Sequence, residues 1–234
     1  MKRCIGVVAI AALAAACHLP LRPAAPGPSS SATPTPSVAA PRPEEPSSPV
    51  RRLAAAVAAD ARVSDHESDL KIRDRLAAEA ARDAEACLAL APQDAACLYS
   101  HGLALGLDAR VHPLHANGAL KTMLGALEKA EAAEPAYDEA GPARVGALVL
   151  IRAPGWPLGP GDPDAGLAAA RRAATVRPLH PPNALVLAEA LAKTGDSRGA
   201  QEAYRQAREL SQAMPQTSDR DEWLREAEQA LGGH

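Results

Sequence analysis

From about residue 51 to the C-terminus, apolar side chains recur every three or four positions, which is the period of a helix with one buried face. Pro, Gly and Asp interrupt this pattern at short intervals, and each interruption predicts the end of one helix and the start of the next. We therefore expect an all-α protein. The predicted helices span residues 51–63, 69–90, 95–109, 116–133, 137–152, 163–176, 183–193, 197–212 and 219–231.

The interruptions follow a repeat. Pro92, Pro135 and Pro178 each come after a predicted helix, and they lie 43 residues apart. The segment that begins at Gly161 matches the segment that begins at Gly195, with Gly-Asp over Gly-Asp after a shift of 34 residues. Thirty-four residues is the tetratricopeptide period, in which each repeat is a hairpin of two helices.

The last of these segments also carries the side chains that such a hairpin needs. Ala200, Tyr204 and Ala207 follow the tetratricopeptide pattern of a small residue, an aromatic residue and a small residue on one helix face. The small residues let an antiparallel helix approach closely, and the larger residue fills the gap between neighbouring hairpins. We predict a tetratricopeptide-like helical-hairpin solenoid over residues 51–234.

The composition agrees with closely packed helices. Apolar residues make up 47% of the 234 residues, most of them Ala, and the chain contains no Phe. A core built from such small side chains is thin, which suits helices in close contact. The only aromatic side chain of the last predicted helix is Trp223, and we expect it to pack on the preceding hairpin as part of a terminal cap.

Two connections are longer than the repeat requires. The stretches "DARVHPLHANG" and "RAPGWPLGPGD" each join the first helix of a pair to its own second helix. In a solenoid all such connections project from one edge. The sequence therefore predicts that six residues lie on one rim beside a groove lined by the first helices, and that the rim and the groove engage a partner. The rim candidates are His112, His115, Gly155, Trp156, Pro157 and Asp162.

The second of these connections is stiff. Its prolines end the preceding helix and its glycines supply turns, and Asp162 precedes a helix whose first residue is Pro163, as expected for an N-cap. Trp156 either packs between hairpins or presents a surface to a partner. We favour packing.

The N-terminus predicts export. Lys2 and Arg3 precede an uncharged apolar run of 13 residues, which suits a signal peptide and is too short to span a bilayer. The "LAAA" before Cys17 resembles a lipobox, so residues 1–16 are the expected signal peptide and Cys17 the expected lipid-bearing first residue of the mature chain. Cleavage of an ordinary Ala-x-Ala site at the same place would instead release a soluble periplasmic protein.

Residues 17–50 read as a linker. Positions 18–50 hold ten of the 22 prolines and have few side chains to bury, so we expect a disordered Pro/Ser/Ala-rich tether between the lipid anchor and the helical domain.

An oxidising compartment would also affect two other cysteines. Cys87 and Cys97 lie five residues on either side of Pro92, at matching heights on two antiparallel helices, so a disulfide between them is expected. Two buried free thiols in small-residue positions are the alternative.

Other chemistry finds little support. His101, His112 and His115 lack the spacing and neighbours of a metal site, and we expect no metal and no cofactor. Nucleophile-elbow and phosphate-loop motifs are absent from the sequence, so we expect no enzymatic activity. The net charge of −3 and the lack of a basic block argue against nucleic-acid binding.

Two stretches resemble a known family. The run from Ala153 to Leu210 contains a P-G-W-P loop, a G-D restart and a tetratricopeptide-like hairpin, and "DRDEWLREAEQAL" forms a Trp-bearing last helix. Together they resemble the T-component family of tripartite ATP-independent periplasmic (TRAP) transporters. The resemblance covers about residues 80–234 and implies a periplasmic lipoprotein that works beside a solute-binding protein and that self-associates. This chain has fewer aromatic residues and a long proline tether.

Two functional hypotheses follow. The first is a non-catalytic, lipid-anchored protein of the bacterial cell envelope, facing the periplasm, that binds a protein partner such as the solute-binding subunit of a TRAP-type transporter. The second is a carrier that holds a small apolar ligand or lipid in a helical cavity or an oligomeric channel. A general scaffold of an envelope assembly is a further alternative.

Overall fold

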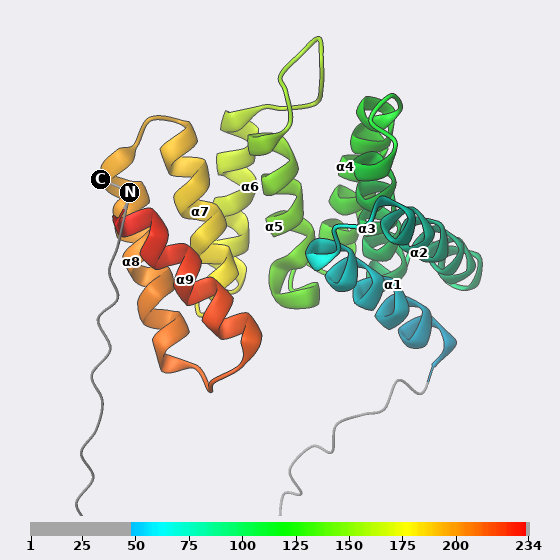
Figure 1. The fold of residues 1–234 in the computed structure, drawn as a ribbon, viewed down its shortest axis with the longest axis horizontal. Helices are drawn as coiled ribbons and strands as arrows, with labels where there is room; N and C mark the ends of the chain where they lie inside the picture. The colour runs from blue at the N-terminus through cyan, green and yellow to red at the C-terminus, as the bar shows by residue number, and fades with distance from the viewer. Residues whose placement is uncertain (1–47, 233–234) are drawn as a thin grey trace, which may run out of the picture. The chain divides into compact units, whose positions relative to one another are not determined.

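Nine α-helices and no strand make up residues 48–232, the part of the chain that the computed structural model describes (Figure 1). The signal peptide, Cys17 and nearly all of the linker expected from the sequence lie outside these residues. The helices are α1 (Pro49–His66), α2 (Leu70–Leu90), α3 (Ala95–Val111), α4 (Ala116–Ala133), α5 (Tyr137–Arg152), α6 (Pro163–Val176), α7 (Pro181–Lys193), α8 (Ser197–Ala213) and α9 (Ser218–Gly232).

Aspartates start four of these helices. The carboxylates of Asp69, Asp94, Asp162 and Asp196 accept hydrogen bonds from backbone N–H groups in the first turns of α2, α3, α6 and α8. Such caps satisfy donors that have no partner within the helix. They fix where each helix begins, and these starts lie within one residue of the predicted ones.

Two starts differ from the prediction because proline occupies the first turn. Helix α1 begins at Pro49, so the predicted end of the linker, residue 50, is two residues too late. The Ser48 hydroxyl accepts a hydrogen bond from Arg51 N at 3.2 Å, and Pro49 needs no such partner. Helix α7 likewise begins at Pro181 rather than at residue 183.

The prediction of an unbroken helix over residues 137–152 was wrong at its start. Asp138, Glu139 and Ala140 have φ values of 46°, 55° and 64°, which place three consecutive residues in the left-handed region. For residues with a Cβ this conformation costs about 1–2 kcal/mol each. The regular helix follows, with Pro142 in its first turn, where a missing N–H is tolerated.

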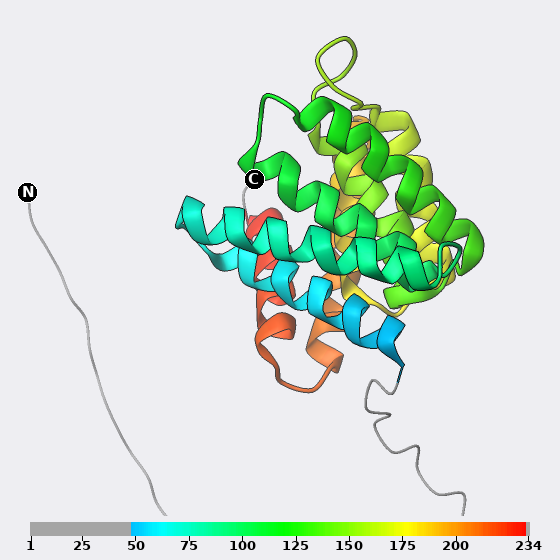
Figure 2. The same cartoon turned by 90° about the vertical axis from the view of Figure 1, so that its right-hand side faces the viewer.

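Helix packing follows a regular scheme within residues 48–232. Each helix runs antiparallel to the one before it and packs against it (Figures 1 and 2). Each odd-numbered helix also contacts the next odd-numbered helix, whereas the even-numbered helices of this region do not contact one another. The odd-numbered helices therefore line one face of the described region.

Small residues make these contacts close. Several alanines expose none of their surface: Ala80, Ala84, Ala130, Ala147, Ala170, Ala173, Ala188 and Ala207. Their side chains allow neighbouring backbones to approach, as the alanine-rich sequence predicts.

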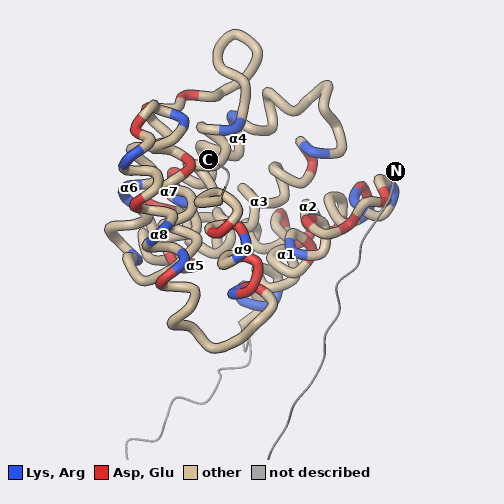
Figure 3. The backbone as a smooth tube through the Cα atoms, turned by 60° about the vertical axis from the view of Figure 1, so that its left-hand side comes forward, with Lys and Arg blue, Asp and Glu red and all other residues tan. Residues whose placement is uncertain are grey.

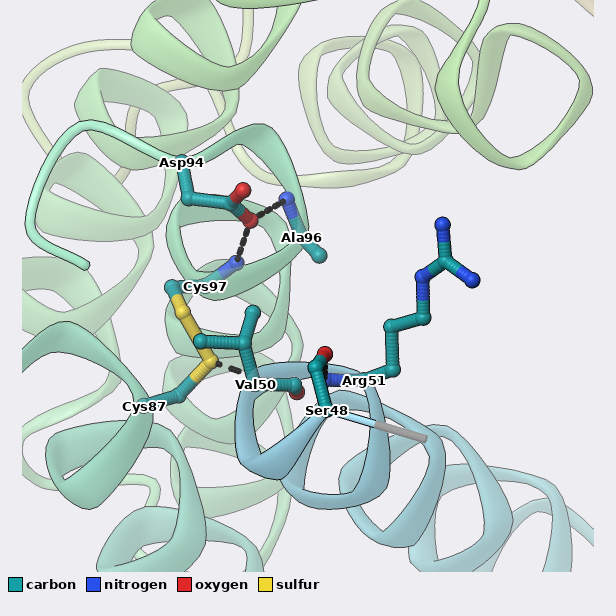
Figure 4. Close-up of a disulfide and its surroundings, with 7 residues drawn as sticks. All are labelled: Ser48, Val50, Arg51, Cys87, Asp94, Ala96 and Cys97. Carbon is teal, nitrogen blue, oxygen red and sulfur yellow. Dashed lines mark hydrogen bonds between the residues drawn. A yellow bond between two sulfur atoms is a disulfide. The ribbon is translucent and has the colours of Figure 1, made fainter. Parts of the chain in front are cut away.

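A disulfide joins α2 to α3. The sulfurs of Cys87 and Cys97 are bonded, with Cα atoms 5.2 Å apart (Figure 4). Asp94, in the turn between them, accepts hydrogen bonds from the N–H groups of Ala96 and Cys97. The carbonyl oxygen of Val50 lies 3.7 Å from Cys87 Sγ, so the first turn of α1 packs over the disulfide.

None of the helices in residues 48–232 combines the length and the apolar character that crossing a bilayer would require.

Candidate binding groove

Two hollows on the face of the odd-numbered helices form the candidate site. One, of about 390 Å³, lies among α1, α3, α4 and α5, and the other, of about 410 Å³, lies among α1, α5, α7 and α9. Asp65, Leu148 and Arg152 line both hollows. Because they share these walls, we treat the two hollows as one binding groove.

The floor of the groove is apolar. Leu148, on α5, stands where the two hollows meet. Side chains of α3, α4 and α5 continue the floor on one side and side chains of α7 and α9 on the other. The further apolar lining residues are Leu103, Leu107, Leu120, Met123, Val145, Val149, Leu185, Val186 and Trp223.

Ion pairs tie the charged side chains of the groove to its walls. Arg110 of α3 pairs with Asp65 of α1. Arg152 of α5 forms two hydrogen bonds with Glu189 of α7, at 2.8 and 2.6 Å. Hydrogen bonding to Glu189 raises the pKa of Arg152, against the effect of burial. These ion pairs therefore hold both arginines in place at the groove surface.

The wall formed by α9 is acidic. Asp219, Glu222 and Glu226 line the second hollow on this helix. Burial raises the pKa of Glu226, the charge of Arg152 opposes that rise, and Glu189 adds to it. The groove thus presents basic residues on α1 and α5 opposite acidic residues on α9.

A polar network supports the groove, and its central residue, Arg144, also lines the second hollow. Arg144, whose side chain is 13% exposed, donates to Asp138 at 3.1 Å, to the carbonyls of Asp138 and Glu139, and to the side chain of Asn183. The Tyr99 hydroxyl donates to Asp138 at 2.8 Å. Burial, and then the negative charge of Asp138, raise the pKa of Tyr99 well above its usual range.

Asn183 completes this network. It is 1% exposed, and its amide donates to three backbone carbonyls, those of Glu139, Ala173 and Arg177. These bonds connect α5, α6 and α7, and together with Arg144 they satisfy carbonyls of the left-handed turn. The sequence does not indicate this network, because the bonds that join Asn183 to Arg144 and to Glu139 span 39 and 44 residues.

Trp223, which lines the second hollow, packs against His180. Their rings pack edge to face with centroids 5.5 Å apart. Burial, and then the positive charge of Arg144, lower the pKa of His180 to about 4. Trp223 is partly buried against the cluster that contains Ala184, Leu185 and Ala207, as expected for a terminal cap.

The long connections project from one edge. The rim loops are residues 112–115 between α3 and α4 and residues 153–162 between α5 and α6. Both lie at the upper ends of their helices in Figures 1 and 2, and residues 153–162 rise beyond the helices. Neither hollow includes any of the predicted rim residues in its lining. The rim and the groove are therefore neighbouring but separate surfaces.

The preference for a packed Trp156 was wrong. Its side chain is 87% exposed. Hydrogen bonds within the loop backbone satisfy the turn without help from the indole: Gly161 N donates to the carbonyl of Pro154 at 2.8 Å, and Gly159 N to that of Gly155 at 3.2 Å. The loop holds its shape through its backbone, so the indole is left outside.

The other rim residues have local roles. Asp162 caps α6 by accepting a hydrogen bond from Ala165 N at 3.0 Å, and Gly155 pairs with Gly161 in an isolated bridge. His112 contacts the carboxylates of Asp108 and Asp74 at 2.8 and 3.3 Å. The remaining two, His115 and Pro157, are exposed.

The repeat-signature residues pack as their types suggest. Ala200 and Ala207 are 4% and 0% exposed and face α7, while Tyr204 is half-buried beside them. Gly195 has φ of 90°, a conformation that favours glycine, in the turn between α7 and α8.

Within residues 48–232, no cluster of three or more His, Cys, Asp or Glu side chains is arranged to hold a metal ion. His101 and His112 line a shallow hollow between α2 and α3, with Asp74 and Asp108. A larger hollow of about 700 Å³ lies at the N-terminal ends of α1, α3 and α5. Ser48, the first described residue, stands in its wall, and we assign no ligand to it.

Comparison with models of protein families gave no match, and comparison with curated proteins gave none either.

Proposed function

We propose that this chain is a non-catalytic lipoprotein of the bacterial cell envelope whose tetratricopeptide-like hairpins bind a protein partner in the groove. The packing scheme supports the hairpin assignment. The pairs α1–α2, α3–α4, α5–α6 and α7–α8 stack so that first helices contact first helices and line one face. Repeat proteins present their binding surfaces in this way.

The shape and chemistry of the groove favour a polypeptide partner. Its apolar floor runs across α3, α5 and α7, and charged side chains of both signs flank it. An amphipathic helix or an extended segment would place apolar side chains over Leu148 and polar ones against the flanking charges. Opposite charges on the two walls would then fix the orientation of the partner.

The solute-binding subunit of a TRAP-type transporter is the partner that the sequence resemblance implies. Lipid attachment at Cys17 would hold this chain at a membrane, on the periplasmic side, where such a subunit works. The disulfide between Cys87 and Cys97 fits an oxidising compartment. The resemblance also implies self-association, so a second copy of the chain is the other protein that the groove would meet.

Photocrosslinking in cells tests the groove. A benzoylphenylalanine placed at Arg62 or at Glu222 would sit in opposite walls of the groove, because both residues are exposed and line the same hollow. The same group at Lys129 of α4 or Arg205 of α8, exposed positions outside the two hollows, is the matched control.

We expect the two groove positions to yield the same adduct, and mass spectrometry to identify a solute-binding protein in it. Adducts of equal yield from Lys129 and Arg205 would contradict binding in the groove. An adduct that contains a different envelope protein would retain the groove and overturn the transporter assignment.

A carrier of a small apolar ligand is the second candidate. The hollow among α1, α3, α4 and α5 is lined mainly by apolar side chains, and its volume of about 390 Å³ lies in the range of small-molecule sites. Native mass spectrometry would support the carrier if the chain, purified from its envelope, retained a lipid that Leu107→Gln releases.

A further inference from the structure

The rim loops expose their largest apolar side chains. Trp156, Leu158 and Leu114 are 87%, 76% and 94% exposed. Most large apolar side chains of a folded protein are at least partly covered, and an exposed group of them at one edge marks a contact with something outside the chain.

These side chains are held outward by rigid backbone. In residues 153–162, Asp162 N donates to the carbonyl of Leu150 at 2.9 Å, and Leu158 N to that of Gly155 at 3.0 Å. In the other loop, His115 N donates to the carbonyl of His112 at 3.0 Å. Because the backbone polar groups are partly satisfied within each loop, the tips can enter an apolar environment at a reduced cost.

The tips also lack formal charge. Residues 153–161 contain no Asp, Glu, Lys or Arg, and neither do residues 113–120, in a chain of which 23% is charged (Figure 3). Charged side chains make an exposed loop more soluble. Two neighbouring tips without charge therefore indicate that the tips contact an uncharged environment.

The two tips share one edge. Both lie at the upper ends of their helices in two orthogonal views, and residues 153–162 rise farther beyond the helices than residues 112–115 do (Figures 1 and 2). A pocket on a protein partner would accommodate one protruding tip, whereas a flat boundary accommodates both at once. Tryptophan is enriched at the boundary between lipid and water, where its ring meets apolar chains and its N–H meets water.

We infer that the rim loops insert Trp156, Leu158 and Leu114 into the interfacial layer of a lipid bilayer. This inference rests on the proposed envelope location. Cys17 and Ser48 are 31 residues apart, and a chain of that length reaches at most about 100 Å, which exceeds the expected diameter of a domain of this size. A lipid anchor at Cys17 would therefore leave the domain free to present this edge to the same membrane.

Tryptophan fluorescence with vesicles tests the inference directly. The chain from residue 17 onward retains every described residue, and Cys17→Ser removes the acylation site. Trp223→Phe leaves Trp156 as the only tryptophan, since the chain contains two. Vesicles of phosphatidylethanolamine and phosphatidylglycerol should shift the emission of Trp156 to shorter wavelength, and brominated lipid should quench it.

Substitution at the tips should weaken vesicle binding. Trp156→Ser combined with Leu158→Ser should lower the partition coefficient about tenfold or more, measured by sedimentation with vesicles with Trp223 retained. The matched control is Leu179→Ser, because Leu179 is 77% exposed but follows the opposite end of α6, and it should bind as the unsubstituted chain does.

Unchanged Trp156 emission with vesicles would overturn the inference, and so would equal partition of the tip and control variants. If a groove adduct forms in cells but vesicles leave the emission of Trp156 unchanged, the proposed function is retained and the membrane contact is rejected. Vesicle binding without any groove adduct would retain the membrane contact and reject the proposed function.

Discussion

Apolar side chains have opposite environments in the groove and in the rim loops. In the groove, Leu148 lines the same hollow as Arg152, whose charge is paired with Glu189, and a buried network supports the floor. On the rim, Trp156 stands 87% exposed on a loop without charge. The apolar groove residues are thus part of the helix packing, whereas the indole of Trp156 is not.

This difference separates two kinds of contact within one small domain. A surface that is part of the packing cannot change without loss of stability, because its residues are also bonded to one another. A surface that projects from rigid loops can change freely. Variants should therefore show large stability effects in the network that supports the groove and negligible ones at the rim.

The largest effect is expected in the network that supports the groove. Arg144→Ala removes the donor to the carbonyl of Asp138 and one of the donors to the Asp138 carboxylate and the Glu139 carbonyl, and Asn183→Ala removes a buried amide that bonds to α5, α6 and Arg144. Each change should lower the free energy of unfolding by roughly 2–4 kcal/mol, measured by urea denaturation.

The exposed Arg171 of α6 provides the control. Arg171→Ala should change the same free energy by less than about 0.5 kcal/mol. If Arg144→Ala unfolds at the same urea concentration as Arg171→Ala, the network does not hold the turn.

A smaller loss is expected at Trp223. Trp223→Ala removes an aromatic ring that packs on Ala227, Ala184 and the ring of His180. Because the ring is only partly buried, we expect a loss of roughly 2 kcal/mol rather than the full value for a core aromatic side chain. Thermal unfolding followed by circular dichroism would measure it.

His180 makes the stability of the fold sensitive to pH. Its pKa is about 4 in the folded chain and close to 6.5 when unfolded. Between these values the unfolded chain binds more protons, so stability falls as the pH drops from about 6.5 towards 4. Because His180 keeps some contact with solvent, we expect a loss of about 1–2 kcal/mol rather than the full shift.

Comparison with His180→Gln isolates this contribution. The pKa of Glu226 is raised, so the carboxylate acts in the opposite direction over an overlapping range, but it is present in both proteins and cancels in the difference. Equal slopes of unfolding free energy against pH in the two proteins would contradict the assignment to His180.

The smallest effect is expected at the rim. Trp156→Ala should leave the unfolding free energy within about 0.5 kcal/mol of its original value, because the indole is exposed and the loop is held by backbone hydrogen bonds. A loss comparable to that of Trp223→Ala would show that Trp156 supports the fold after all.

The sequence predicts the helices well because their signals are local. Asp94 and Asp162 start helices through bonds to residues two or three positions away, and alanines such as Ala130 and Ala207 occupy the closest contacts by size alone. Such information is present in a short window of residues.

What the sequence does not predict depends on distant partners. The left-handed turn at Asp138 is stabilised by Tyr99 and Asn183, each about 40 residues away. The exposure of Trp156 follows from a loop that closes on its own backbone, which a count of prolines and glycines does not show. The groove likewise joins side chains of six helices, α1, α3, α4, α5, α7 and α9, and only the stacking of pairs brings them together.

The central claim is that the groove, and not the rim, binds the protein partner. The most direct measurement compares the crosslinked adduct from position 222 in chains that carry Leu148→Asn or Trp156→Ala, at matched levels of folded protein. The account predicts that Leu148→Asn abolishes the adduct and that Trp156→Ala leaves its yield unchanged. Loss of the adduct with Trp156→Ala, or its persistence with Leu148→Asn, would contradict it.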